Sequence, residues 1–139
     1  MTSILLVEDQ PTLRQLLSEV LEFSGYQVTA VADGREALDL LEVGEYFPNL
    51  ILSDLLMDRL DGDELLQAVR SNWLWREIPF IIMSGQDQIT ALRLELKREV
   101  NGYLEKPFGI ADILSTVQKA LSKREQGSDQ KHSGSERLA

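Results

Sequence analysis

The chain has 139 residues, 43% of them hydrophobic and 27% charged, which is typical of one soluble globular domain. It contains no cysteine, which excludes disulfides and thiolate metal sites, and its net charge of −9 argues against direct nucleic-acid binding through a basic face. No apolar run approaches the ~20 residues of a membrane span and no signal peptide opens the chain, so we expect a cytoplasmic protein. The single histidine, His132, lies in a polar segment, which argues against a histidine-based metal site or catalytic triad.

Five segments predict β-strands. The first, third and fourth are uniformly apolar, as in strands buried on both faces, whereas the second alternates, as in a strand nearer an edge. The five segments are residues 4–7, 26–31, 50–54, 80–83 and a short one near 103–104.

A helical pattern follows each predicted strand. Pro11 suits the first turn of the first helix, and Gly25 suits its end. Asp33 and Asp61 each precede a glutamate three positions later, which predicts the N-cap of the second and third helices. Residues 88–98 are helical by propensity, and residues 110–121 carry the cleanest amphipathic stripe in the chain.

Five alternations of strand and helix predict an α/β fold with a doubly wound, five-stranded parallel sheet of flavodoxin-like order 2-1-3-4-5. We expect one domain over residues 1–123 and a disordered polar tail over residues 124–139. In this order Asp9 and Asp54 face each other across the crevice between the first and third strands. Ligands of such sheets bind at that crevice.

Three carboxylates, Glu8, Asp9 and Asp54, stand at the ends of these two strands. Without a cation, their mutual repulsion would raise their pKa values. A hard divalent cation tolerates such a cluster, and Mg²⁺ takes one or two protein carboxylates together with waters and phosphate oxygens. Taken alone, however, an acidic pair such as Glu8 and Asp9 after a strand is more often a cap of the following helix than a ligand.

Two further polar residues follow the fourth and fifth strands. Lys106, before Pro107, is either a structural counter-ion or a ligand of a phosphoryl oxygen. Ser84, before Gly85, is either a turn residue or a hydroxyl donor at the same edge of the sheet. Neither residue decides the function by itself.

The combination resembles the receiver domain of two-component response regulators. The resemblance spans roughly residues 3–123, and its motifs occur in the family's order at strand ends. These motifs are Glu8-Asp9, Asp54, Met57, Asp61-Gly62, Ser84-Gly85 and the run Tyr103-Leu104-Glu105-Lys106-Pro107-Phe108.

The resemblance implies that Asp54 is the phosphoacceptor, which takes a phosphoryl group from a histidine kinase or a histidine phosphotransfer protein. It implies a Mg²⁺ cofactor bound directly by Asp9 and Asp54, by Glu8 largely through water, and by the backbone carbonyl of Leu56. Such a protein catalyses only its own phosphorylation and dephosphorylation.

The resemblance also implies how the signal leaves the site. Lys106 binds one phosphoryl oxygen, Ser84 moves to hydrogen-bond another, and Tyr103 follows from an outward to an inward rotamer. Output is then the binding of a downstream protein on the face made by the fourth helix, the last strand and the fifth helix. We expect a monomer, with a dimer as the alternative, because residues 100–103 lack the run typical of members that dimerise through that face.

The chain departs from the family near Asp54. Asp58 replaces the proline that usually follows the Met57 position, which should loosen the loop and add negative charge. Leu56 and Gln86 occupy positions that tune the lifetime of the aspartyl phosphate. Because leucine cannot position an attacking water, we predict a comparatively long-lived phosphoryl state.

Trp73 and Trp75 have two interpretations. Packing over the core margin is favoured, and contact with a partner is the alternative.

Four alternatives compete with a switch that acts alone. The first is that the chain is the receiver part of a longer regulator with an output domain. A Mg²⁺-dependent phosphatase of the haloacid-dehalogenase type would need an acid at Leu56. A flavin-binding module would need a phosphate-binding loop where Asp9-Gln10-Pro11 stands, and an inert scaffold would not need every phosphorylation position filled.

Overall fold

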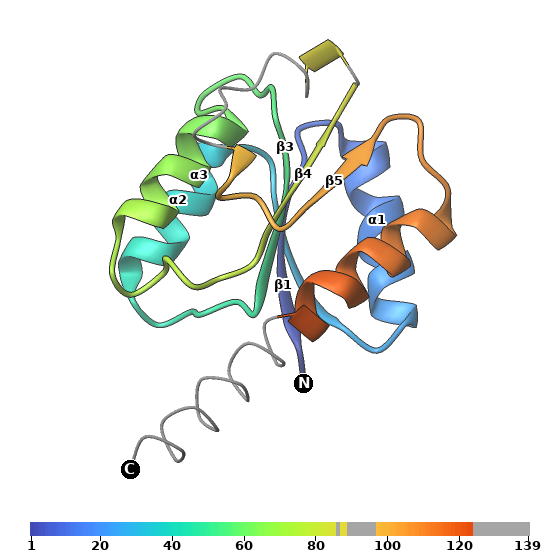
Figure 1. Ribbon diagram of the computed structural model, residues 1–139, viewed down its shortest axis with the longest axis horizontal. Helices are drawn as coiled ribbons and strands as arrows, with labels where there is room; N and C mark the ends of the chain where they lie inside the picture. Colours follow the sequence, from blue (N-terminus) through green and yellow to red (C-terminus); the bar gives the residue numbers. More distant parts are fainter. Residues whose placement is uncertain (86, 89–96, 124–139) are drawn as a thin grey trace.

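The computed structural model describes residues 1–85, 87–88 and 97–123. It has a five-stranded, all-parallel sheet of order β2-β1-β3-β4-β5, as predicted (Figure 1). The strands are β1 (Ser3–Val7), β2 (Gln27–Val31), β3 (Leu50–Asp54), β4 (Phe80–Ser84) and β5 (Gly102–Glu105). The helices are α1 (Pro11–Phe23), α2 (Gly34–Val43) and α3 (Gly62–Ser71), and residues 110–123 form a helix that we call the C-terminal helix.

Several predictions concern residues outside the described ranges. These are the disorder of residues 124–139, most of the fourth helix at 88–98, and the effect of Gln86 on the phosphoryl lifetime.

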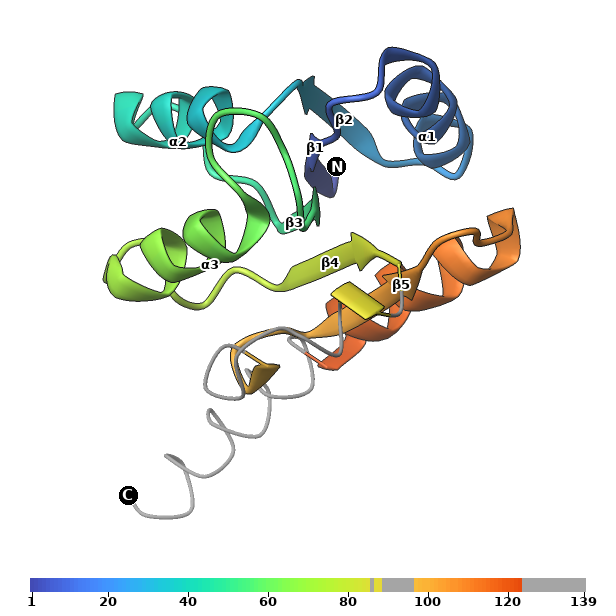
Figure 2. The same ribbon diagram turned by 90° about the horizontal axis from the view of Figure 1, so that it is seen from above.

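Helices cover both faces of the sheet. α2 and α3 lie on one face, and α1 and the C-terminal helix lie on the other (Figures 1 and 2). Successive side chains of a strand point to opposite faces, so a strand covered on both sides must be apolar throughout. Leu5 and Ile51 accordingly belong to the core under α2 and α3, whereas Ile4 and Leu50 belong to the core under α1 and the C-terminal helix.

The helix starts follow the predicted capping chemistry. Pro11 is the first residue of α1. The Asp33 carboxylate accepts a hydrogen bond from the backbone N–H of Glu36 at 2.9 Å, which satisfies a free donor at the start of α2. At α3 the side chain of Glu64 accepts from the backbone N–H of Asp61 at 3.2 Å.

The two tryptophans differ. Trp75 is only 6% exposed and belongs to the core under α2 and α3, so the packing interpretation is right for it. Trp73 is 76% exposed, so the packing interpretation is wrong for this residue.

The strand register brings the predicted site residues to one edge. Val7 pairs with Ser53, which sets the next residue, Glu8, beside Asp54. Asp54 pairs with Met83, and Ser84 pairs with Glu105, the residue before Lys106. The carboxyl ends of four strands therefore meet at the same place.

Candidate functional site

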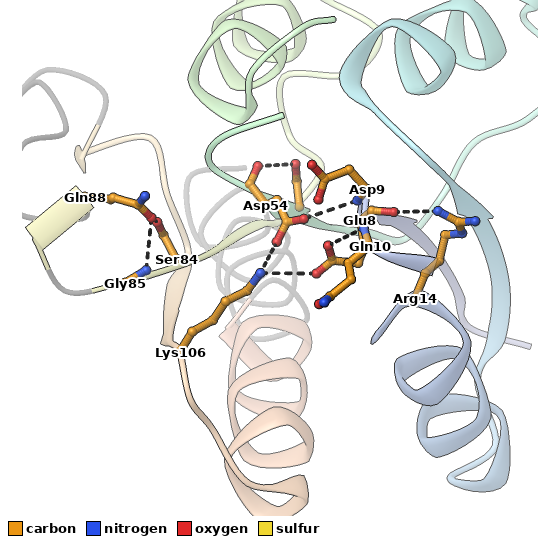
Figure 3. A network of polar contacts seen from close by, with 10 residues as sticks. Glu8, Asp9, Gln10, Arg14, Asp54, Ser84, Gly85, Gln88 and Lys106 are labelled. Atoms are coloured by element: carbon orange, nitrogen blue, oxygen red, sulfur yellow. Dashed lines mark hydrogen bonds and ion pairs between the residues drawn. The ribbon is translucent and has the colours of Figure 1, made fainter. Parts of the chain in front are cut away.

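Glu8, Asp9 and Asp54 form a single acidic group at the carboxyl end of the sheet (Figure 3). One carboxylate oxygen from each lies within 4.8 Å of the others. Glu8 is fully buried and Asp54 is 2% exposed, whereas Asp9 is open to solvent. Two buried carboxylates and one accessible carboxylate thus share a small volume.

Lys106 is the direct counter-ion of this group. Its Nζ lies 2.8 Å from Asp54 Oδ1 and 3.3 Å from Glu8 Oε1. The lysine is partly exposed, so its ammonium joins the buried carboxylates to the solvent-accessible mouth of the site. It is the only cationic side chain on these two carboxylates among the ion pairs of the described residues.

Backbone donors fix the orientation of the buried carboxylates. The N–H of Gln10 donates to Glu8 Oε2 at 3.0 Å, and the N–H of Asp9 donates to Asp54 Oδ2 at 3.3 Å. Arg14 Nη1 donates to the backbone carbonyl of Glu8 at 3.0 Å and holds the turn before α1. Glu8 therefore serves the local turn and the acidic group at once. The contribution of Arg14 depends on its rotamer, and no sequence pattern indicated it.

The electrostatics of the group are those of three close carboxylates that have one ammonium, Lys106, beside them. Burial, followed by the neighbouring Glu8, raises the pKa of Asp54 to about 8, although Lys106 opposes the shift. Burial also acts to raise the pKa of Glu8, but hydrogen bonds and the Lys106 charge outweigh it and lower that pKa. The pKa of Asp9 is raised by burial and by Glu8, and the charge of Asp58 adds to the effect. The donor set is the one that Mg²⁺ prefers, because it offers carboxylate oxygens with excess negative charge.

Ser84 lies at the end of β4 and is 3% exposed. Its hydroxyl donates a hydrogen bond to Gln88 Oε1, which also accepts from the backbone N–H of Gly85 at 3.2 Å (Figure 3). Gln88 is a site residue that the sequence analysis missed. A glutamine four positions after a strand-end serine carries no recognised signal.

A cavity of about 270 Å³ opens over Asp54. This volume leaves room for several groups of the size of a water molecule. The side chain of Leu56 is about half exposed and apolar there, so it offers no group that could hold a water. The lining residues are Asp9, Asp54, Leu55, Leu56, Met83, Ser84, Gln88 and Lys106.

The start of α3 packs directly against the end of β3. A Cβ on Gly62 would lie 2.1 Å from the backbone oxygen of Asp54, so only glycine fits at this contact. The N–H of Gly62 donates to the carbonyl of Leu55 at 2.7 Å, and Asp61 Oδ1 accepts from the N–H of Met57 at 2.7 Å. Asp61 and Gly62 thus shape the loop that carries Leu56.

Tyr103 lies on β5, away from the acidic group. It is partly buried against the core under α2 and α3, and its hydroxyl donates to the carbonyl of Lys97 at 3.3 Å. Of the predicted site residues, the structure brings Glu8, Asp9, Asp54 and Lys106 into one contact network. Ser84 and Leu56 line the same cavity, and Tyr103 does not line it.

A second group of close carboxylates, Asp61, Asp63 and Glu64, opens α3. Asp63 accepts from the N–H of Glu64 at 2.9 Å, and Glu64 accepts from the N–H of Asp61 at 3.2 Å. Capping explains this group without a cation.

None of the helices in the described parts of the chain is long and apolar enough to cross a membrane.

Comparison with known proteins gives a consistent result. A family model for the response regulator receiver domain matches residues 4–118. The response regulator MprA of Mycolicibacterium vanbaalenii is 33% identical over 118 residues, which are 85% of this chain and 49% of the relative. The chain thus spans about half the length of the curated relatives it matches.

Solved structures are similar over nearly their whole length. The receiver domain of a histidine kinase from Syntrophus aciditrophicus is 32% identical with a TM-score of 0.78, over 88% of this chain and 92% of that chain. The receiver domain of the sensor histidine kinase PA1611 from Pseudomonas aeruginosa is 31% identical with a TM-score of 0.74, over 87% of this chain and 98% of that chain. That structure is described with a magnesium ion coordinated in the active site cleft.

Proposed function

Because the chain belongs to the response regulator receiver domain family of two-component signalling, we propose that it is a phosphorylation-dependent switch with Asp54 as its phosphoacceptor. Members of this family are signalling proteins rather than metabolic enzymes. One observation carries the assignment of Asp54. Its buried carboxylate stands under an open cavity, 2.8 Å from an ammonium and beside two further carboxylates.

Mg²⁺ is the cofactor that this proposal requires. Receiver domains bind Mg²⁺ in an acidic site, and the donor set of this chain fits such an ion. Asp9 and Asp54 would hold it directly, Glu8 would hold it largely through water, and the carbonyl of Leu56 would complete the protein ligands. When bound, the ion neutralises negative charge on the carboxylates and on the phosphoryl oxygens.

Phosphoryl transfer at this site depends on positioning and charge. A carboxylate oxygen of Asp54 attacks the phosphorus of a phosphohistidine on a histidine kinase or a histidine phosphotransfer protein. The P–N bond breaks as the P–O bond of the aspartyl phosphate forms. The Lys106 ammonium passes from Asp54 to a phosphoryl oxygen, and the Ser84 hydroxyl donates to another.

The added charge then biases a two-state element. Tyr103 on β5 follows Ser84, and the face that includes β5 and the C-terminal helix, with the fourth helix predicted from the sequence, presents the result to a downstream protein effector. Leu56 provides no group to position water, so the phosphoryl state is long-lived.

A longer regulator is the second candidate. The matched relatives are about twice as long as this chain, which favours an attached output domain as the effector. The mass of the protein expressed from its native gene would distinguish the two candidates. An attached output domain would make it about twice as long as this chain, whereas a separate effector would not.

The test is phosphoryl uptake from a small acyl phosphate in buffer with Mg²⁺, followed by intact mass. Wild type should gain one phosphoryl group, and Asp54→Asn should gain none. Asp39→Asn makes the same carboxylate-to-amide change on the exposed surface of α2 and should behave as wild type. Uptake by Asp54→Asn at the wild-type rate would contradict the assignment. Steady hydrolysis of a phosphate ester would instead favour the phosphatase.

A further inference from the structure

Gln88 contacts the site but has no part in the proposed phosphoryl transfer. Its Oε1 accepts two hydrogen bonds, one from the Ser84 hydroxyl and one from the Gly85 N–H at 3.2 Å. The glutamine is exposed and lines the cavity over Asp54, whereas Ser84 is buried (Figure 3). The contact therefore links a buried site hydroxyl to a solvent-facing residue of the segment after β4.

The hydroxyl of Ser84 has a single proton and can donate one hydrogen bond at a time. Among the described residues the Ser84 hydroxyl donates to Gln88 Oε1 and not to the acidic group. A phosphoryl group on Asp54 offers a competing, charged acceptor, which forms a stronger bond than an amide oxygen does. Donation to the phosphoryl group therefore requires that the bond to Gln88 break.

We propose that Gln88 is a positioning residue that holds Ser84 in the unphosphorylated arrangement and is released when Asp54 is phosphorylated. This inference rests on the proposed roles of Asp54 and Ser84. On release, Gln88 keeps only the Gly85 N–H, so the segment after β4 loses its side-chain connection to the site. Gln88 thus opposes activation until the phosphoryl group is present.

The expected effect follows from the net strength of one neutral hydrogen bond. Removing a bond of this kind from the unphosphorylated state shifts the equilibrium towards the activated state about fivefold.

The experiment measures the dissociation constant of beryllofluoride with Mg²⁺, a stable mimic of an acyl phosphate, by titration calorimetry. Gln88→Met keeps the length of the side chain and removes the acceptor, and it should tighten binding about fivefold. Gln88→Glu retains an acceptor oxygen at the same reach and should give no tightening. The unfolding free energy of each variant shows that it is folded under the assay conditions.

A Ser84→Ala background isolates the contact. Adding Gln88→Met to Ser84→Ala should leave the dissociation constant of Ser84→Ala unchanged, because no hydroxyl remains for Gln88 to hold. If Gln88 only caps the Gly85 N–H, Gln88→Met would lower the unfolding free energy in both backgrounds and leave binding unchanged. That result, or equal tightening in both backgrounds, overturns the inference.

The two proposals fail in different ways. If wild type binds beryllofluoride and Asp54→Asn does not, the phosphoacceptor assignment stands whatever Gln88→Met does. Absence of binding to wild type would overturn both.

Discussion

The two ends of the sheet differ in the charge of their buried polar side chains. At the amino end, polar side chains bind backbone groups. Asn49 Oδ1 accepts from the N–H of Ser3 at 2.7 Å, and Asn101 Oδ1 accepts from the N–H of Phe80 at 2.8 Å. At the carboxyl end, the buried carboxylates of Glu8 and Asp54 also accept from backbone N–H groups, but in addition they share the side-chain cation of Lys106.

This difference separates stability from activity. Backbone groups paired at the amino end remove unsatisfied donors and stabilise the fold. At the carboxyl end, burial, followed by the neighbouring Glu8, raises the pKa of Asp54 to about 8, which favours the binding of a cation at this site. Substitutions at the amino end should therefore change stability and spare phosphorylation, and those at the carboxyl end should do the reverse.

Lys106→Met should give the largest effect. It removes the cation that receives a phosphoryl oxygen, so phosphoryl uptake from an acyl phosphate should slow about a hundredfold. Stability should change less than in the amino-end variant below, since Asp54 can take up a proton in place of the lost ion pair. Rapid-quench kinetics and urea unfolding measure the two effects. A variant that phosphorylates normally but unfolds easily would reverse the comparison.

Asn101→Ala tests the amino end. It leaves the buried N–H of Phe80 without its acceptor and removes the 2.8 Å contact with Arg70 Nη2, so the unfolding free energy should fall by about 2 kcal/mol. The rate of phosphoryl uptake should equal that of wild type. Asn72→Ala is the matched control, because Asn72 serves an exposed turn and its loss should cost less than about 1 kcal/mol. Equal losses in the two variants would count against the argument.

Asp33→Asn tests an exception to the comparison between the two ends of the sheet. Asp33 follows β2 at the carboxyl end but has a structural role, because Arg59 Nε donates to it at 2.7 Å. The hydrogen bond from Arg59 lowers the pKa of Asp33 from its ordinary value of 3.8, although burial opposes the shift. The ionised carboxylate therefore stabilises the fold above about pH 4, and this stability is lost as pH falls through the lowered pKa.

The expected size is small because the Arg59 side chain is 56% exposed and solvent screens the pair. Asp33→Asn should reduce the unfolding free energy by about 0.5 kcal/mol at pH 7, while its side chain can still cap α2. The difference from wild type should shrink as pH falls below 4, and salt should reduce it at pH 7. Chemical unfolding over a pH series measures it. If the difference in unfolding free energy between wild type and Asp33→Asn grew as pH fell, the ionised carboxylate would be destabilising and the prediction would be wrong.

The sheet and the helix starts could be predicted from the sequence because the apolar pattern of the strands and the N-cap residues are local signals. Uniformly apolar strands and N-caps such as Asp33 need only nearby residues to be recognised. Parallel strands share one carboxyl edge, so Asp54 and Lys106 could be expected to lie near each other before any distance was known. Their contact at 2.8 Å agrees with that expectation.

Other contacts depend on information that no periodicity contains. The contact between Gln88 and Ser84 depends on the side-chain rotamer of Gln88. Arg59 lies in an irregular loop and contacts Asp33, which is 26 positions away in the sequence. Trp73 and Trp75 stand two positions apart in a connection without regular structure, so their opposite exposure depends on how that connection packs.

The late position of Lys106 in the sequence also determines when the site can be completed during synthesis. The ion pair between Glu8 and Lys106 joins residues 98 positions apart, and that between Asp54 and Lys106 joins residues 52 apart. Glu8 and Asp54 are synthesised before their cation. Lys106 follows β5 in the sequence, so it is synthesised only after all five strands. A chain shortened before β5 would leave the Glu8 and Asp54 carboxylates without this ammonium, so we expect it not to accept a phosphoryl group.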